Sequence, residues 1–338
     1  MRILLTGHTG FKGSWMSLML NHLGHEVFGY ALPPEEKSLF NQAHVEKVLA
    51  SDKRADIRSL YELSKFIKDT SPEFIIHLAA QPLVLESYRI PHETFTINTE
   101  GTNNLLQASR MSKNLQGILV ITTDKVYLES TKNARFVEGD PLGGSDPYSA
   151  SKAAADLLAQ SIALSWDVAP IGIARAGNVI GGGDWSVDRL LPDLARAMTS
   201  GERIVIRYPH AVRPWQHVLD CLDGYVQFMN HIVSRQDKLE ILNFGPNQKE
   251  NWTVLQIINY INDNLLNGEL SIQIADAQHH ESSYLQLESS KANQLLKWSN
   301  RFETLEAVKK TVSWYEKQLL GRDMQSESLF EIATFLKK

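Results

Sequence analysis

A tyrosine and a lysine stand four residues apart, Tyr148 and Lys152, at the start of a helix-like segment. Residues at this spacing share one face of a helix. A free tyrosine has a pKa of about 10, and lowering that pKa to near neutrality requires about 4 kcal/mol. An ammonium about 4 Å away, at an effective dielectric constant of about 20, supplies an energy of that size. The pair therefore predicts a tyrosine that acts as a general base toward a hydroxyl group.

A second group of reactive side chains follows the apolar run 117–121: Thr123, Asp124 and Lys125. Open parallel sheets bind ligands at the carboxyl ends of their strands. We therefore expect these side chains to lie in one pocket with Tyr148, where the Thr123 hydroxyl can hydrogen-bond the same substrate oxygen. A solvated turn is the alternative interpretation of the two charged residues.

Three glycines form a G-x-x-G-x-x-G pattern between the first predicted strand and the first predicted helix. Such glycines let the backbone approach a pyrophosphate, which binds at the positive end of the helix. The pattern predicts a dinucleotide-binding loop whose contacts are Gly7, Thr9, Gly10, Phe11, Lys12 and Gly13. A purely structural strand–helix turn is the alternative. A Walker A loop is excluded because no G-K-[ST] sequence is present.

The second predicted strand ends without an acidic residue for a ribose 2′-hydroxyl and without an arginine for a 2′-phosphate. Asp56 follows the next short segment, where it is placed to meet the adenine. On this pattern we favour NAD over NADP as the cofactor. The remaining cofactor contacts are expected from Ile57, Leu78, Ala79, Ala80, Asn98, Tyr148 and Lys152.

Short apolar runs alternate with helix-like segments through the first half of the chain. The runs expected to form strands are residues 2–7, 25–32, 73–80, 117–124 and 170–181. The segments expected to form helices are residues 15–24, 60–67, 96–111 and 151–166. Continuously apolar strands separated by helices are typical of a parallel sheet covered on both faces. The pattern predicts an α/β fold with a Rossmann-type doubly wound parallel sheet. The first helix is expected to face the core with Trp15, Leu18, Met19 and Leu23.

A glycine-rich stretch near residue 180 interrupts this alternation. We expect an NAD-binding Rossmann domain from residues 1–177 and 212–240. A smaller α+β domain for the nucleotide-sugar substrate is expected from residues 178–211 and 241–320. Residues 321–338 are expected to form a helical C-terminal tail.

The overall composition excludes several classes of protein. A net charge of −5 and a pI near 6.1 argue against a nucleic-acid partner. No apolar run reaches the roughly 18–20 residues of a membrane span, and the N-terminus is not expected to be a signal peptide. The single cysteine, Cys221, allows no internal disulfide and is expected to be a small buried hydrophobic residue. These features favour a cytoplasmic protein.

Several longer motifs resemble the extended short-chain dehydrogenases/reductases that act on nucleotide sugars, most closely the CDP-glucose branch of the 4,6-dehydratases. The motifs are "GHTGFKGSW", "HLAAQPLV", "TTDKVY", "DPYSASKAAA", "RAGNVIGGGDW", "DRLLPD", "RPWQHVL" and "NFGPN". They cover residues 7–247, and "YLQLESSKANQLLKW" extends the resemblance to residue 298. The glycine loop and Y-x-x-x-K mark only the superfamily, whereas "RAGNVIGGGDW" together with "RPWQHVL" is far more specific.

This resemblance implies an internal redox elimination. Tyr148 and NAD oxidise C4 of glucose to a ketone, which acidifies the C5 proton; water then leaves from C6 and the hydride returns to C6. Asp124 matches the acid that protonates the leaving hydroxyl. Lys125 stands where most related dehydratases have a glutamate base. To act as a base, Lys125 must lose its proton, at a cost of about 4 kcal/mol. The alternative is a charged Lys125 that stabilises the enolate, with Tyr148 or water as the C5 base.

The resemblance also implies substrate contacts from Gln81, Asn178, Arg189, Arg213 and His280. Arg213 matches the position that meets the diphosphate, a role suited to a forked guanidinium. A surface salt bridge is the rival interpretation for Arg189. The adjacent His279, His280 and Glu281 lack the spacing of a metal site, so no metal is expected.

Two departures from the family bear on substrate choice. Leu85 and Glu86 follow "PLV", where the family usually has an arginine, and the segment between Tyr127 and Tyr148 lacks the family's tryptophans. The family forms homodimers through the helices after Asn98 and Tyr148, and we expect the same here. The rival functions are a nucleotide-sugar 4-epimerase and an inactive nucleotide-binding protein.

Overall fold

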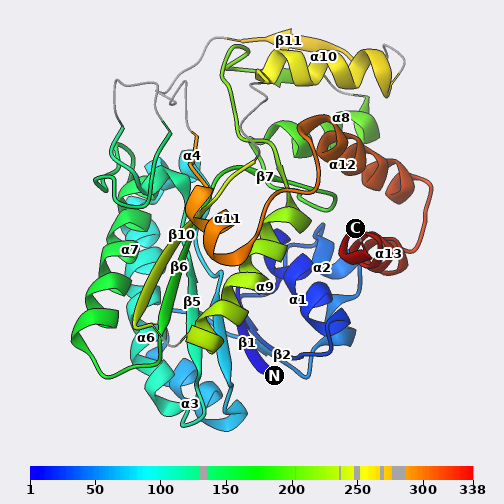
Figure 1. Cartoon of the computed structure of the whole chain (residues 1–338). Coiled ribbons are helices and arrows are strands. Elements are labelled where there is room, and N and C mark those ends of the chain that lie inside the picture. Colours follow the sequence, from blue (N-terminus) through cyan, green and yellow to red (C-terminus); the bar gives the residue numbers. More distant parts are fainter. Residues whose placement is uncertain are drawn as a thin grey trace.

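The computed structural model describes residues 1–129, 135–201, 203–235, 237–246, 252–266, 270–275 and 286–337. A seven-stranded parallel sheet forms its centre, with strand order β10-β6-β5-β4-β1-β2-β3 (Figure 1). The strands are β1 Arg2–Thr6, β2 Glu26–Ala31, β3 Ser51–Arg54, β4 Phe74–His77, β5 Gly117–Ile121, β6 Ile171–Ala176 and β10 Leu239–Phe244. The predicted doubly wound parallel sheet is confirmed.

The order of the strands places a topological switch point between β1 and β4. The chain runs from β1 outward through β2 and β3, and then crosses to β4 on the other side of β1. A ligand crevice is expected outside the carboxyl ends of the strands at such a point. The glycine loop follows β1 and the Thr123–Lys125 segment follows β5, so both reach this edge.

Helices cover both faces of the sheet, and successive strand residues alternate between them. Ile76 packs toward α1 (Phe11–His22) and α9 (Val218–Arg235). Its neighbour Ile75 packs toward the opposite face. The helices of that opposite face are α3 (Leu60–Thr70), α6 (Gly101–Ala108) and α7 (Pro147–Ser165). Strands buried on both sides explain their nearly continuous apolar sequence.

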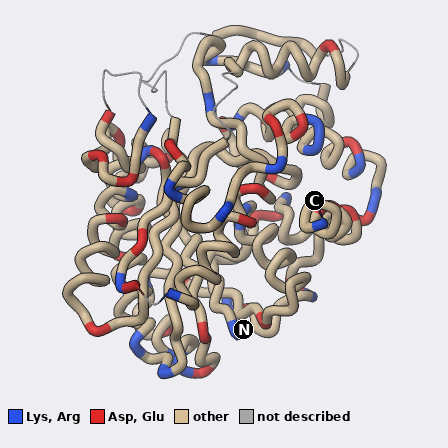
Figure 2. Tube along the Cα trace, viewed as in Figure 1, with Lys and Arg blue, Asp and Glu red and all other residues tan. Residues whose placement is uncertain are grey.

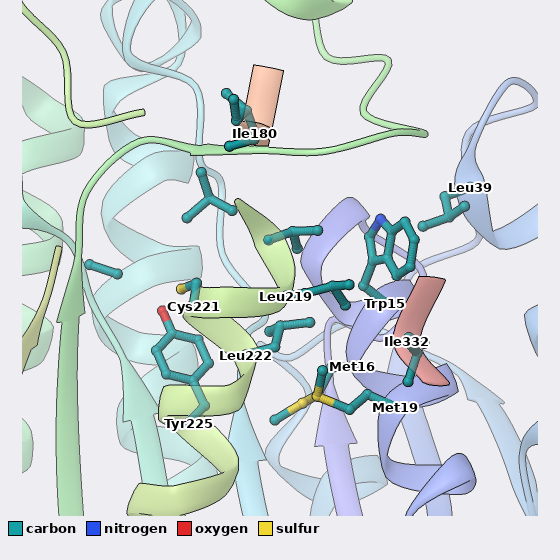
Figure 3. Close-up of a cluster of buried hydrophobic side chains, with 14 of the residues drawn as sticks. Trp15, Met16, Met19, Leu39, Ile180, Leu219, Cys221, Leu222, Tyr225 and Ile332 are labelled. Carbon is teal, nitrogen blue, oxygen red and sulfur yellow. The ribbon is translucent and has the colours of Figure 1, made fainter. Parts of the chain in front are cut away.

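The core between α1 and α9 is drawn in Figure 3. Trp15 and Met19 of α1 meet Leu219 and Leu222 of α9 there, and Cys221 is fully buried, as predicted. Leu23 is 40% exposed, because α1 ends at His22, so its predicted place in the core was wrong.

The C-terminal helix α13 (Met324–Lys337) covers the outer side of α1, which explains why α1 is buried almost all round. Helix α13 lies within the tail that was expected to be helical. Its Ile332 belongs to the same core (Figure 3).

A second, smaller unit covers the carboxyl edge of the sheet (Figure 1). It contains two short parallel pairs, β7 (Val179–Ile180) with β9 (Gln216–His217) and β8 (Ile204–Ile206) with β11 (Ile272–Ile274). Its helices are α8 (Leu190–Ser200), α10 (Val254–Asn264) and α12 (Thr304–Leu319). The predicted boundary at residue 240 falls inside β10, which pairs with β6 throughout. Residues 241–244 therefore belong to the Rossmann sheet, and α11 (Ser290–Leu296) packs beside them.

Charged residues of both signs are interspersed along the described chain (Figure 2). None of the described helices combines the length and the apolar character that crossing a membrane would require.

Candidate active site

A cavity of about 1560 Å³ opens at the carboxyl edge of the sheet. Its walls come from the loops after β1, β4, β5 and β6, from the start of α7, and from the smaller unit. The cavity brings together almost every site residue predicted from the sequence. The predicted residues that line it are Gly7, Thr9, Gly10, Phe11, Lys12, Gly13, Asp56, Ile57, Leu78, Ala79, Ala80, Gln81, Thr123, Lys125, Tyr148, Lys152, Asn178, Arg189 and Arg213.

The glycine loop leaves no room for a side chain at Gly7 or at Gly13. Gly7 has a φ of +74°, and a Cβ there would lie 2.7 Å from the backbone nitrogen of Ala79. A Cβ on Gly13 would lie 2.1 Å from the Gly7 carbonyl oxygen. Helix α1 begins after Gly10 without a side-chain cap, so its first N–H groups are available to an anion. This loop fits the pyrophosphate of a dinucleotide.

Asp56 lines the cavity on the side where the adenine is expected, and hydrogen bonds hold it in place. Its backbone oxygen accepts a hydrogen bond from the Tyr30 hydroxyl at 3.0 Å, and its carboxylate is held by Arg58 Nη2 at 2.6 Å. The hydrogen bonds from Arg58 keep the pKa of Asp56 below its usual value. The residue therefore stands as a fixed anion beside the cavity.

Asn98 is not among the residues that line the cavity, so its predicted cofactor contact stays a prediction. It lies in the π-helical turn Thr96–Glu100 and is buried. Its Nδ2 donates to the Gln81 carbonyl at 3.1 Å and to Ser151 Oγ at 2.9 Å, and its Oδ1 accepts from the Gln81 N–H at 2.8 Å. Asn98 thus supports the backbone at Gln81. The amide of Gln81 donates to Leu83 and Thr94, so much of its hydrogen-bonding capacity is used within the fold.

The predicted acid–base pair occupies two different environments. Lys125 is half-buried and lines the cavity. Asp124 does not itself line the cavity. Its carboxyl is 1% exposed and lies behind Gly177, a lining residue whose added Cβ would be 2.9 Å from Oδ2, and its Oδ1 accepts a hydrogen bond from Thr123 Oγ1 at 2.9 Å. Oδ2 has no hydrogen-bond partner among the described residues. Burial raises the pKa of Asp124 against the opposing charges of Lys125 and Arg213, as an acid at this position requires.

The tyrosine–lysine pair differs from the sequence prediction in its electrostatics. Burial raises the pKa of Tyr148 to about 12, although its hydrogen bond with Thr123 opposes this. Burial and the charge of Lys12 lower the pKa of Lys152 to about 8. The Lys152 ammonium donates to the carbonyl of Ile121 at 2.8 Å. In this structure, loss of water around the phenol therefore outweighs any help from Lys152, and the predicted fall in the Tyr148 pKa is not found.

Two predicted arginines, Arg189 and Arg213, line the cavity. Arg213 is 9% exposed, and its Nη1 donates to the Val212 carbonyl at 3.1 Å. Arg189 forms an ion pair with Asp184 at 3.1 Å, as the rival interpretation expected, and it also lines the cavity; its contact with the substrate stays a prediction. The predicted contact His280 lies outside the described residues, together with His279 and Glu281.

Several cavity residues were missed by the sequence analysis. Aromatic and acidic side chains contribute to the substrate side: Tyr88, Glu129, Asp146, Tyr208 and Trp215. Two of them carried a signal, because Trp215 lies in the "RPWQHVL" motif and Asp146 begins the "DPYSASKAAA" motif. Leu85 and Glu86, which depart from the family pattern, also line the cavity from α4 (Val84–Arg89), where Glu86 pairs with Arg89 at 3.3 Å.

Comparison with known proteins agrees with this site. Residues 3–245 match the model of the NAD dependent epimerase/dehydratase family. The chain is 38% identical to the CDP-glucose 4,6-dehydratase of Salmonella typhimurium, over 99% of this chain and 96% of that protein. It is 26% identical to dTDP-glucose 4,6-dehydratase 1 of Escherichia coli, over 93% and 92% of the two chains.

Solved structures of nucleotide-sugar enzymes share the fold. The UDP-glucose-4-epimerase of Stenotrophomonas maltophila superposes with a TM-score of 0.84 at 20% identity, covering 95% of this chain and 99% of the other. The dTDP-glucose 4,6-dehydratase of Bacillus anthracis gives 0.79 at 23% identity, covering 94% and 97%. At these identities the likeness concerns the fold.

Proposed function

The chain belongs to the NAD dependent epimerase/dehydratase family, and we propose that it is a nucleotide-sugar 4,6-dehydratase that converts CDP-glucose to CDP-4-dehydro-6-deoxyglucose. One observation carries this proposal. The same cavity is lined by Tyr148 and Lys152, which would act in the oxidation of C4, and by Lys125. The carboxyl of Asp124, the acid of the acid–amine pair, is buried next to Lys125. A 4-epimerase has no use for an acid at C6, whereas a dehydratase requires one.

NAD fits the glycine loop, and when bound it supplies the hydride acceptor for C4 and the hydride donor for C6. The protein's part in the first step is to remove the proton of the C4 hydroxyl. Tyr148 takes this proton, and the Thr123 hydroxyl, which hydrogen-bonds Tyr148, holds the same oxygen. Because the Tyr148 pKa is high in this structure, the neighbouring cations must stabilise the phenolate as it forms.

The resulting ketone makes the C5 proton acidic, and elimination breaks the C5–H and C6–O bonds. Asp124 donates the proton that converts the C6 hydroxyl to water. Lys125 has two candidate roles, base toward the C5 proton or cation beside the enolate oxygen. A Lys125→Ala variant with C5-deuterated substrate separates them, because unchanged loss of deuterium would remove the role of base.

We also infer a homodimer formed through α5 (Pro91–Phe95), α6 and α7. These helices lie side by side, and they expose Phe95 and the residues Leu157 and Leu164 of α7. The side chains of Leu157 and Leu164 are 53% and 66% exposed, which favours a covered apolar face. A cytoplasmic role in making deoxysugar precursors of lipopolysaccharide or other surface polysaccharides fits this activity.

The direct test supplies the NAD-loaded protein with CDP-glucose and, separately, with UDP-, dTDP- and ADP-glucose. We expect a 4-keto product that has lost one water from CDP-glucose, with deuterium from C4 of labelled substrate transferred to C6. In D2O the product should also carry deuterium at C5. An epimer of unchanged mass would support the 4-epimerase, and no turnover of any sugar nucleotide would support an inactive binding protein.

A further inference from the structure

A buried ion pair between Arg175 and Asp156 is bonded to Thr122 and Tyr127, two residues that line the cavity. We propose that Arg175 and Asp156 are positioning residues that fix the segment Thr123–Tyr127 against helix α7, with the Tyr127 hydroxyl as the link to that segment. The functional consequence of this proposal rests on the proposed 4,6-dehydratase activity.

Asp156 attaches helix α7 to the end of strand β5. It lies one turn beyond Lys152 and is fully buried. Its carboxylate accepts hydrogen bonds from Arg175 Nε at 2.9 Å and Nη2 at 2.8 Å, and from Thr122 Oγ1 at 3.0 Å. Lys152 bonds the preceding residue, Ile121, at 2.8 Å. Two successive turns of α7 are therefore bonded to two successive residues at the end of β5.

Arg175 extends the same network to the far end of the catalytic segment. Its Nη1 donates to the Tyr127 hydroxyl at 2.9 Å and to the Glu138 carbonyl at 3.0 Å. The Tyr127 hydroxyl in turn donates to Asn243 Oδ1 at 2.7 Å. The Tyr127 ring stacks on Phe136, with centroids 4.8 Å apart. One guanidinium thus contacts both the helix that carries Tyr148 and the residue that ends the segment carrying Asp124 and Lys125.

The geometry assigns different tasks to the two ends of the network. Removing the Tyr127 hydroxyl leaves both bonds between α7 and β5 in place, so Tyr148, Lys152 and Thr123 keep their support. The stretch that holds Asp124 and Lys125 loses its bond to Arg175. A displacement of about 1 Å in catalytic groups can cost roughly 100-fold in rate. Elimination should therefore suffer while oxidation at C4 continues.

Tyr127→Phe is the discriminating variant, because removing either charge of the buried ion pair would leave the other charge buried and unpaired and would endanger folding. Ser112→Ala serves as the matched control. Ser112 is buried, and its hydroxyl makes one hydrogen bond, 2.7 Å to the Pro72 carbonyl, away from the network. Both variants remove one buried hydroxyl, and the loss of stability should be larger in Tyr127→Phe, because the Tyr127 hydroxyl bonds a charged group as well as Asn243.

In the experiment, each NAD-loaded protein is mixed with CDP-glucose and the reaction is quenched at short times. The sugar nucleotides are then identified by mass spectrometry. For Tyr127→Phe we expect the ketone that retains its C6 oxygen to accumulate, with dehydration slowed roughly 10- to 100-fold. Ser112→Ala should form the dehydrated product as the wild type does. Equal slowing of both steps in Tyr127→Phe, or slowing of neither, overturns the proposal.

Hydrogen–deuterium exchange provides a readout that needs no substrate. In Tyr127→Phe, peptides covering residues 122–128 should exchange faster, whereas peptides covering residues 148–156 should be unchanged. If the substitution changes the exchange rate equally in both regions, or in neither, the positioning role is contradicted. A wild-type protein that leaves CDP-glucose unchanged would instead refute the proposed function, and the exchange result would still decide the inference.

Discussion

The cofactor side and the substrate side of the cavity are built in different ways. The cofactor side consists mainly of backbone: the glycine loop, the N-terminus of α1 and the Leu78–Ala80 turn. The side that we propose for the substrate consists of side chains from separate segments, among them Arg189, Arg213 and Tyr208. The fold itself therefore determines what the first side binds, whereas individual side chains determine what the second side binds.

The largest effect is expected from adding a methyl group to the glycine loop, which should weaken the binding of NAD. In Gly13→Ala the added Cβ would lie 2.1 Å from the Gly7 carbonyl oxygen, so the loop must shift. We expect the Kd for NAD to rise by roughly 100-fold, about 3 kcal/mol, in a calorimetric titration. Gly139→Ala, where an added Cβ meets no atom within 4 Å, is the control. A folded Gly13→Ala protein with wild-type affinity for NAD would refute the backbone account.

A side-chain deletion should affect only the substrate side. Arg213→Ala removes a mostly buried guanidinium from the cavity wall. Charge-assisted hydrogen bonds contribute about 1.5–3 kcal/mol, so the KM for CDP-glucose should rise roughly 10- to 100-fold. The affinity for NAD should be unchanged, and exposed Arg322→Ala should change neither quantity. An equal loss of NAD binding in Arg213→Ala would erase the distinction between the two sides.

The smallest effect is expected on stability, from replacing Lys152. This residue is buried and lines the cavity. Its pKa falls from 10.5 to about 8 in the folded protein, so below pH 8 the folded state carries an unfavourable buried charge. Lys152→Met removes this penalty, which is up to about 3 kcal/mol at neutral pH, but it also removes the hydrogen bond to the Ile121 carbonyl, so the net gain in stability should be smaller. The wild type binds fewer protons folded than unfolded between these pKa values, so its stability rises with pH there. The gap in Tm should accordingly shrink from pH 8 toward pH 10. A gap that widens would contradict the assigned shift.

The same contrast explains what the sequence could predict. The glycine loop, Tyr148 and Lys152 are local patterns attached to strand ends, and the parallel sheet brings them to one edge. The hydrogen bonds of Asn98 could not be predicted, because its partners, Gln81 and Ser151, are distant in sequence.

The Arg175–Asp156 pair could not be predicted from the sequence either. Arg175 lies in strand β6 and Asp156 in helix α7, and only the packing of the helix on the sheet brings the two together. The residue-240 boundary was wrong for a related reason, since nothing in the apolar run 239–244 tells which sheet it joins.

The most direct test of the central claim is the product formed by Asp124→Asn. The claim is that Asp124 acts only in elimination, after Tyr148 has helped to oxidise C4. An asparagine keeps the size of the side chain but cannot supply the acidic proton. The account predicts that the variant, mixed with NAD and CDP-glucose, accumulates the 4-keto sugar with its C6 oxygen still attached. Formation of the dehydrated product at the wild-type rate would contradict it.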